Sequence, residues 1–374
     1  MTSHARGSRA STRAAERIAD LCAAGLPAQE LIEGVAERLR DAIAVDGMFL
    51  AATDPETMLA LGPGVVHEMP DTVCEPFWAL EFEVPDYNKF TDLAHGPSQV
   101  ADLHVATGGR PERSARYREM RAFMDADAEL RATFNAGGRA WGLLHAHRAG
   151  GTDGFSADEI AFVERVAPVI GRALRVSLVS QPADGLQGRG PGMAVIDAGN
   201  RVLSATPEAV AWFDEIDSIK RLPASRMGVD LPSEVLNTAQ VARATGGPTR
   251  TRVRTKSGAW LLVHASCLRA PDGTAGSTAL VVEPAKASEV APLIVEAYEL
   301  TAREVDVTRG LARGLTTNEI AHELHLSRYT VADHLKSVYE KVGVSSRAEL
   351  VAKMFADHYH DRVRDAVHAA AIAA

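Results

Sequence analysis

The chain has 374 residues, 46% hydrophobic and 24% charged, which is typical of globular proteins and predicts two or three domains. No run of about 18 apolar residues occurs, so we expect no membrane-spanning helix and no membrane partner. The three cysteines are widely spaced, which argues against disulfide bonds and a zinc site and favours a location in the cytoplasm. The net charge of −9 argues against non-specific binding to nucleic acid. Segment 301–353 is less acidic than the rest of the chain, with eight Lys and Arg against seven Asp and Glu, and specific binding there is not excluded.

Helix and strand patterns alternate in the first half of the chain. Residues 1–14 are polar and rich in Arg and small residues, so we expect a disordered lead-in. Apolar residues at helical spacing predict a helix over 31–43, and residues 139–146 form a strand pattern. Ser156 followed by Glu159 predicts a capped helix, which either packs on its own sheet or pairs with a second copy of the chain.

The middle of the chain predicts a second small domain. Residues 181–191 hold Pro and Gly with few apolar residues, which indicates a linker. A hairpin pattern over 193–203 is followed by a helix N-cap at Thr206, and three strand patterns follow later. We expect an α+β domain over residues 190–285.

Capping signals are concentrated in the segment 300–350. A Ser or Thr is followed three residues later by Glu at three places: Thr301 with Glu304, Thr316 with Glu319, and Ser346 with Glu349. Ser327 is expected to begin a third helix, which Gly343 ends. Four short helices are therefore predicted, and the third leaves a polar face free that the major groove of DNA would admit.

Six short motifs run through this segment: Leu300-Thr301-x-Arg303-Glu304, Gly314-Leu315, Asn318-Glu319-Ile320-Ala321, Leu326-Ser327-x-x-Thr330-Val331-x-x-His334-Leu335, Lys341-Val342-Gly343-Val344 and Ser346-Arg347-x-Glu349-Leu350. Together they resemble the LuxR-type helix-turn-helix. The resemblance implies a DNA-binding transcription regulator, usually active as a homodimer on two-fold sites. The domain would span 295–358, followed by a tail over 359–374.

The resemblance and the polar face of the third helix give the candidate contacts to double-stranded DNA. They are Ser327, Arg328, Tyr329, Thr330, Asp333, His334, Lys336, Ser337 and Lys341. Lys336 occupies a position that contacts DNA in the family, and its other interpretation is an ordinary exposed lysine. Two residues depart from the family pattern. His325 stands where Gly is usual and must adopt a positive φ, and Ala332 replaces a residue that is often basic.

The earlier domains carry looser resemblances. Trp141-Gly142-Leu143-Leu144 and Gly154-Phe155-Ser156-x-x-Glu159-Ile160 are similar to the end of a GAF sensor domain, which would span 15–180. Residues 190–285 look PAS-like. Both kinds of domain have a sheet that can accommodate ligands, so the resemblance leaves open a small-molecule effector or a role in dimerisation alone. The expected fold is multidomain, with α+β GAF-like and PAS-like sensor domains before an all-α four-helix domain.

Motifs for catalysis are absent from the sequence. There is no GxxxxGK[ST], HExxH or GxSxG, so we expect neither an enzyme nor a cofactor. His145 and His147 are expected on opposite faces of a strand, which argues against a shared metal. The main hypothesis is a one-component transcription regulator. The alternative is a signalling or scaffold protein that uses its domains and tail for protein association without specific DNA binding.

Overall fold

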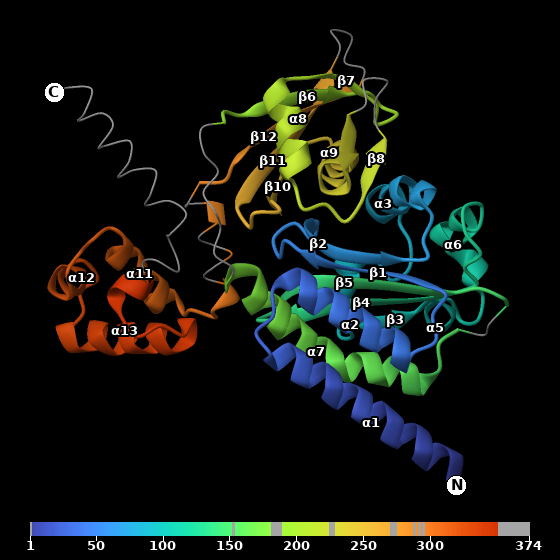
Figure 1. Ribbon diagram of the computed structural model, residues 1–374, viewed down its shortest axis with the longest axis horizontal. Coiled ribbons are helices and arrows are strands. Elements are labelled where there is room, and N and C mark those ends of the chain that lie inside the picture. The colour runs from blue at the N-terminus through green and yellow to red at the C-terminus, as the bar shows by residue number, and fades with distance from the viewer. Residues whose placement is uncertain are drawn as a thin grey trace. The chain divides into compact units, whose positions relative to one another are not determined.

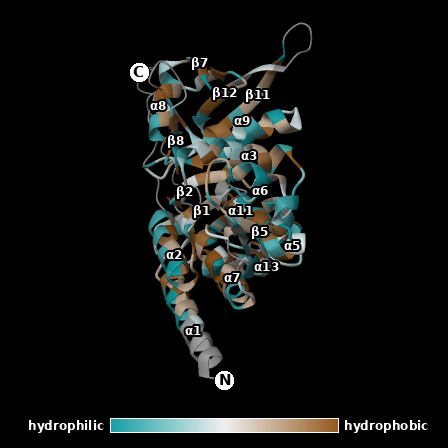
Figure 2. Cartoon of the chain, turned by 90° about the vertical axis from the view of Figure 1, so that its right-hand side faces the viewer, coloured by the Kyte–Doolittle hydropathy of each residue, from teal (hydrophilic) through white to brown (hydrophobic). Residues whose placement is uncertain are grey.

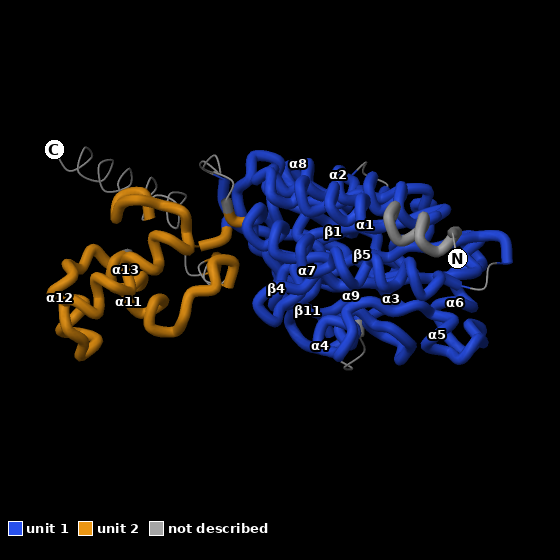
Figure 3. Tube along the Cα trace, turned by 90° about the horizontal axis from the view of Figure 1, so that it is seen from below, with its two compact units in different colours: residues 1–178, 188–284 blue, residues 179–187, 285–374 orange. Residues whose placement is uncertain are grey.

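The structure, a computed structural model, describes residues 2–151, 154–180, 189–223, 229–269, 275–286, 289–290, 293 and 296–350. The chain divides into two compact units, shown in Figure 3: Met1–Leu178 with Gly188–Pro284, and Val179–Gln187 with Ala285–Ala374. Most of the predicted linker 181–191 and the whole predicted tail 359–374 lie outside the described residues. No helix among the described residues is long and apolar enough to cross a membrane.

The first unit begins with an α+β domain built on an antiparallel sheet of five strands. The strands are β1 (Gly47–Thr53), β2 (Ala60–His67), β3 (Val100–Asp102), β4 (Ala128–Ala136) and β5 (Arg139–Arg148). Their order in the sheet is β2-β1-β5-β4-β3, and Leu50 of β1 pairs with Leu144 of β5. Every residue of β1 is buried, because helices cover both faces of this strand.

Three long helices lie on one side of this sheet (Figure 1). Helices α2 (Ala28–Ala42) and α7 (Ala157–Ser180) cover that face, and α1 (Thr2–Ala23) packs against α2. Shorter elements lie beside the other face and the edge: η1 (Asp71–Val73), α3 (Cys74–Glu83), α4 (Phe90–His95), α5 (Leu103–Thr107), η2 (Pro111–Arg113) and α6 (Ala115–Met120). In Figure 2 the outward side of α2 is mainly hydrophilic, as expected for an amphipathic surface helix.

The structure differs from the expectation of a disordered lead-in over residues 1–14. Helix α1 begins at Thr2, and Ala14 and Ile18 are buried where α1 contacts α2. The segment is rich in Ala and Arg, which favour helices.

Helix α7 turns its apolar stripe toward its own sheet, the first of the two alternatives left open by the sequence. Val163, Ile170 and Leu174 are fully buried. Gly171 permits a close approach to the sheet, because a Cβ there would lie 2.5 Å from the carbonyl oxygen of Asn135 in β4. The predicted N-terminal cap is present, since the Ser156 hydroxyl accepts from the backbone N–H of Glu159.

The two histidines of β5 lie on the same face, so the expectation of opposite faces was wrong. Side chains alternate along a strand, and residues two apart share a face. The ring centroids of His145 and His147 are 5.8 Å apart, and burial lowers the pKa of both imidazoles. The described residues still contain no group of three or more His, Cys, Asp or Glu side chains placed to hold a metal.

The first unit also contains a second α+β domain. Its strands are β6 (Gly192–Ile196), β7 (Val202–Ala205), β10 (Thr249–Arg254), β11 (Trp260–Arg269) and β12 (Ala275–Pro284), joined antiparallel in the order β10-β11-β12-β6-β7. Numbered within each domain, both sheets have the strand order 2-1-5-4-3. The two domains therefore share one sheet topology.

Two helices and a small ribbon complete this middle domain: α8 (Pro207–Glu215), α9 (Ser233–Thr245), β8 (Arg221–Pro223) and β9 (Asp230–Pro232). The predicted N-cap of α8 is confirmed, because the Thr206 hydroxyl accepts from the backbone N–H of Ala209. Helix α9 contacts β11 and also α3 of the first domain. Its buried residues therefore contribute both to the core of the middle domain and to an interdomain contact.

A buried ion pair joins the two α+β domains. The Arg252 guanidinium in β10 donates to the Asp54 carboxylate over 2.7 and 2.9 Å, and both side chains are buried. The same guanidinium donates to Glu56 at 2.9 Å. A charge buried here without its partner would be costly, so the pair favours a fixed contact between the domains.

Candidate nucleic-acid interface

The second unit contains the helices α11 (Ala302–Ala312), α12 (Thr317–Glu323) and α13 (Arg328–Val342). The first two begin with the predicted capping boxes. The hydroxyls of Thr301 and Thr316 accept from the backbone N–H of Glu304 and Glu319, whose carboxylates accept from the backbone N–H of the two threonines. Each helix start is thus fixed locally.

The turn between α12 and α13 has the backbone conformation expected of it. His325 adopts a φ of 54°, which confirms the positive φ predicted at this position. The Ser327 hydroxyl accepts from the backbone N–H of Thr330 at 3.1 Å and so begins α13. Gly343, with φ 68°, ends α13 as predicted.

The apolar sides of the three helices form a small core that sets the rotation of α13. Val331, Leu335, Val338 and Val342 are its buried residues, and α13 contacts both α11 and α12. Helices α11 and α12 approach closely at Gly310, where a Cβ would lie 2.8 Å from Cγ1 of Ile320. The apolar stripe of α13 therefore faces inward, and the opposite side is left to solvent.

The outward side of α13 carries the most exposed candidates for DNA contact. Tyr329 is 75% exposed, and Asp333 and Lys336 are also exposed. The Arg328 guanidinium lies 5.6 Å from the centroid of the Tyr329 ring. A helix lying in the major groove would present these residues to base edges and phosphates.

Ser337 and Lys341 lie on a different side of α13 and contact α11. The Ser337 hydroxyl donates to Glu304 Oε1 at 2.6 Å, and the Lys341 ammonium donates to Glu304 Oε2 at 2.6 Å and to the carbonyl of Glu299 at 3.1 Å. These donors lower the pKa of Glu304 to about 2. Both residues therefore have a structural role that the sequence analysis did not foresee.

The remaining candidates lie at the border of the outward side. The hydroxyls of Ser327 and Thr330 are 2.9 Å apart within the N-terminal cap, and Thr330 and His334 are half-buried. Ser327 itself is exposed. Ser327 and Thr330 thus lie at the start of the helix, next to Arg328 and Tyr329.

The start of the predicted fourth helix is capped in a slightly different way. The Ser346 hydroxyl accepts from the backbone N–H of Glu349, as predicted, but the Glu349 carboxylate accepts from the backbone N–H of Ser345. Arg347 donates to the carbonyl of Leu311, which ties this helix to the end of α11. The helix is described as far as Leu350.

Comparison with known proteins identifies this part of the chain. Residues 298–354 match the family of bacterial regulatory proteins named luxR. The C-terminal domain is a LuxR-family helix-turn-helix domain. Its α12 and α13 are the two helices of the motif, and α13 is the helix that such motifs place in the major groove.

Proteins similar to this chain include known regulators. The probable transcriptional regulatory protein SgaR of Hyphomicrobium methylovorum is 51% identical over 53 residues, which cover 14% of this chain and 25% of SgaR. The transcriptional regulatory protein UhpA of Escherichia coli (strain K12) is 48% identical over 56 residues, 15% of this chain and 29% of UhpA. The chain thus spans only about a quarter of the length of each of these relatives.

Similarities to solved structures are distant. The GAF domain from Acinetobacter phosphoenolpyruvate-protein phosphotransferase has 11% identity and a TM-score of 0.33, and the alignment covers 46% of this chain and 97% of that domain. A structure of the Vibrio cholerae VqmA dimer has 16% identity and a TM-score of 0.21, with 49% of this chain and 87% of VqmA covered.

Proposed function

We propose that this protein is a sequence-specific, one-component transcription regulator in which α13 of the LuxR-family domain enters the major groove. The observation that carries the proposal is the rotation of α13. Its apolar stripe is buried, while Arg328 and Tyr329 remain exposed in its first turn and Lys336 remains exposed near its middle. Side chains on the N-terminal part of a recognition helix are the ones that reach base edges.

The proposed DNA contacts fall into two groups. Lys336 and Tyr329 would face bases or phosphates in the groove, and Asp333 would accept from a cytosine amino group. Ser327, Arg328, Thr330 and His334 would meet the backbone near the helix start. Ser337 and Lys341 are left out of the proposed contacts, because Glu304 holds both.

We further propose that the protein acts in the cytoplasm as a homodimer. One helix-turn-helix reads one half-site, so a two-fold operator needs two copies. The two α+β domains, which share one sheet topology, would act as sensor domains that control the DNA-binding domain. The proposed regulation involves a small-molecule effector and no catalysis.

The test is selection of bound genomic fragments with the purified full-length protein, followed by titration at several salt concentrations. A two-fold site bound at roughly 10⁻⁸ M or tighter, with log K falling linearly as log salt rises, supports the proposal. The outward face of α13 carries two acids, Asp333 and Glu340, which offset the positive charges of Arg328 and Lys336. This charge balance favours the scaffold alternative. Self-association with only weak, sequence-independent DNA binding would favour that alternative.

A further inference from the structure

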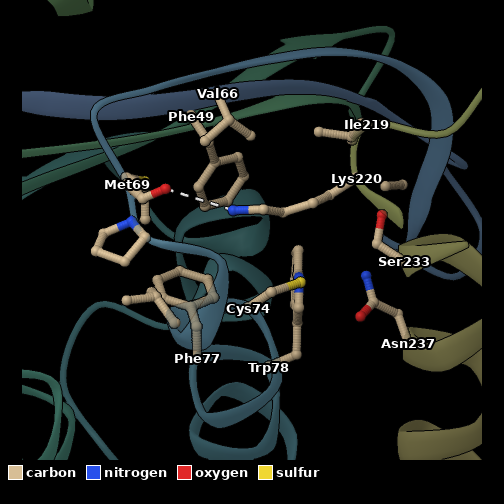
Figure 4. Close-up of a pocket in the computed structure, with 13 residues that line it drawn as sticks. Phe49, Val66, Met69, Cys74, Phe77, Trp78, Ile219, Lys220, Ser233 and Asn237 are labelled. Atoms are coloured by element: carbon tan, nitrogen blue, oxygen red, sulfur yellow. Dashed lines mark hydrogen bonds between the residues drawn. The ribbon is translucent and has the colours of Figure 1, made fainter. Parts of the chain in front are cut away.

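A small cavity lies within the first unit, where the N-terminal and middle domains meet. It has a volume of about 50 Å³ and is open to solvent. One water needs roughly 10–15 Å³ and a closed cavity of about 150 Å³ holds benzene, so an aromatic ring would enter this space in part and extend into its opening. Figure 4 shows the side chains that surround it, contributed by β1, β2, α3 and their connections on one side and by Ile219, Lys220, Ser233 and Asn237 on the other.

The walls of the cavity are mainly apolar and partly aromatic. Phe49, Phe77 and Trp78 are buried and lie in contact with one another, with ring centroids 5.4 Å apart for Phe49 and Phe77. Val66 and Ile219 add aliphatic surface from the two domains. Such a lining favours a ligand with an aromatic ring.

One polar group in the wall lacks a partner. Asn237, on α9, is only 1% exposed, and its Oδ1 has no hydrogen-bond partner. Figure 4 shows this amide directed from the middle domain toward the cavity and Trp78. A buried acceptor without a donor costs about 1–3 kcal/mol, which a ligand hydroxyl or N–H would recover.

The charges around the cavity favour a neutral ligand. Among the described residues that line it, Lys220 is the only one charged at neutral pH, and its ammonium already contacts Asp71 at 2.6 Å. Its side chain extends across the cavity toward the carbonyl of Met69, as Figure 4 shows. A cationic ligand would meet no acid in the wall, and an anionic ligand would have to compete with Asp71.

We propose that this interdomain cavity binds a small neutral aromatic molecule that carries one hydrogen-bond donor, held by ring contacts with Phe49, Phe77 and Trp78 and by donation to Asn237 Oδ1. The ligand would touch both α3 and α9 and so tie the two α+β domains together. Its role as an effector rests on the proposed function, but its binding does not.

The test uses phenol and toluene, which have nearly the same shape and differ in the donor. Binding is measured by calorimetry on the full chain without DNA. We expect phenol to bind about tenfold more tightly than toluene, because only phenol satisfies Asn237. Asn237→Leu should reverse this order. The matched control is Gln240→Met on the same helix, which removes a partly buried donation to the backbone carbonyl of Glu75 outside the cavity wall and should keep the preference.

Chemical labelling of the cysteines gives an independent test of where the ligand binds. All three are partly buried, but only Cys74 lines the cavity. Saturating phenol should slow the labelling of Cys74 by N-ethylmaleimide severalfold and leave Cys22 and Cys267 unchanged, as measured by mass spectrometry. Absence of saturable phenol binding, equal shielding of the three cysteines, or an unchanged preference in Asn237→Leu would each overturn the proposal. Phenol binding by a protein that fails to bind DNA would overturn only the proposed function.

Discussion

The carboxylate of Glu304 in the first turn of α11 accepts a 2.6 Å hydrogen bond from the ammonium of Lys341 near the end of α13. The same carboxylate caps its own helix through the backbone N–H of Thr301. One buried acid therefore sets both the start of α11 and the position of α13 against it. This contact holds the recognition helix at the rotation on which the proposed function depends.

Removal of this acid should destabilise the LuxR-family domain. We expect Glu304→Ala to lower its free energy of unfolding by roughly 2–3 kcal/mol, because the acid holds charge-assisted hydrogen bonds. Urea unfolding followed by circular dichroism measures the change. Asp306→Ala is the control on the same helix, since Asp306 makes only the longer ion pairs with Arg303 and Arg309. Equal losses for both variants would show that Glu304 has no special role.

The stability of this domain should also fall in acid. The pKa of Glu304 is lowered to about 2, so the folded state binds fewer protons than the unfolded state between that value and the ordinary value near 4.5. The stabilisation is complete above about pH 4.5 and is lost as the pH falls toward 2. In Glu304→Gln, this part of the pH dependence should disappear from unfolding curves recorded between pH 5 and 2.

Lys336→Ala should weaken DNA binding without unfolding the domain. Loss of one phosphate or base contact is expected to cost about 1–3 kcal/mol of affinity. If the contact is to phosphate, the slope of log K against log salt should fall by about one. Lys341→Ala is the matched comparison, and it should reduce stability while the salt slope is unchanged. A melting temperature lowered by Lys336→Ala as much as by Leu335→Ala would show that the assigned rotation of α13 is wrong.

Glu234 on α9 should make the first unit less stable as the pH rises. Burial raises its pKa to about 7, so the folded state binds more protons than the unfolded state. Stability is then highest below about pH 4.5 and falls, by on the order of 3 kcal/mol, up to about pH 7. Glu234→Gln should flatten this slope in urea unfolding, whereas the exposed Asp214→Asn should retain it.

The ion pair between Asp54 and Arg252 should couple the two α+β domains. Asp54→Ala removes the carboxylate that accepts two hydrogen bonds from the buried Arg252 guanidinium, and we expect a loss of about 3–5 kcal/mol. The double variant Asp54→Leu with Arg252→Met should recover most of it, since apolar residues replace both charges. Scanning calorimetry measures the stability of the original chain, the single variant and the double variant. A double variant no more stable than Asp54→Ala would contradict the role assigned to the pair.

Features with local causes were predictable from the sequence. The capping boxes at Thr301 and Thr316, the N-caps at Thr206 and Ser327 and the positive φ at His325 depend on residues within a few positions. The same local signals located the helix-turn-helix, which the family match confirms. They also fixed which side of α13 is apolar.

Features with distant causes were not predictable. Glu304 and Lys341 are 37 residues apart, and only the packing of α11 on α13 brings them together. A hint was available, because Ser337 and Lys341 are spaced one turn apart and lie beside the apolar stripe. The cavity around Asn237 has lining residues from both domains, so no single segment of sequence could indicate it.

Asp54 and Arg252 are 198 positions apart, yet each neutralises the other in the interior of one unit. An exchange of genetic material that replaced only the N-terminal domain, or only the middle domain, would leave one of these charges without its counterpart. The two domains are therefore inherited most safely as a single block. A recombination point that adds or removes a neighbouring module is best tolerated after Pro284, where the compact unit ends.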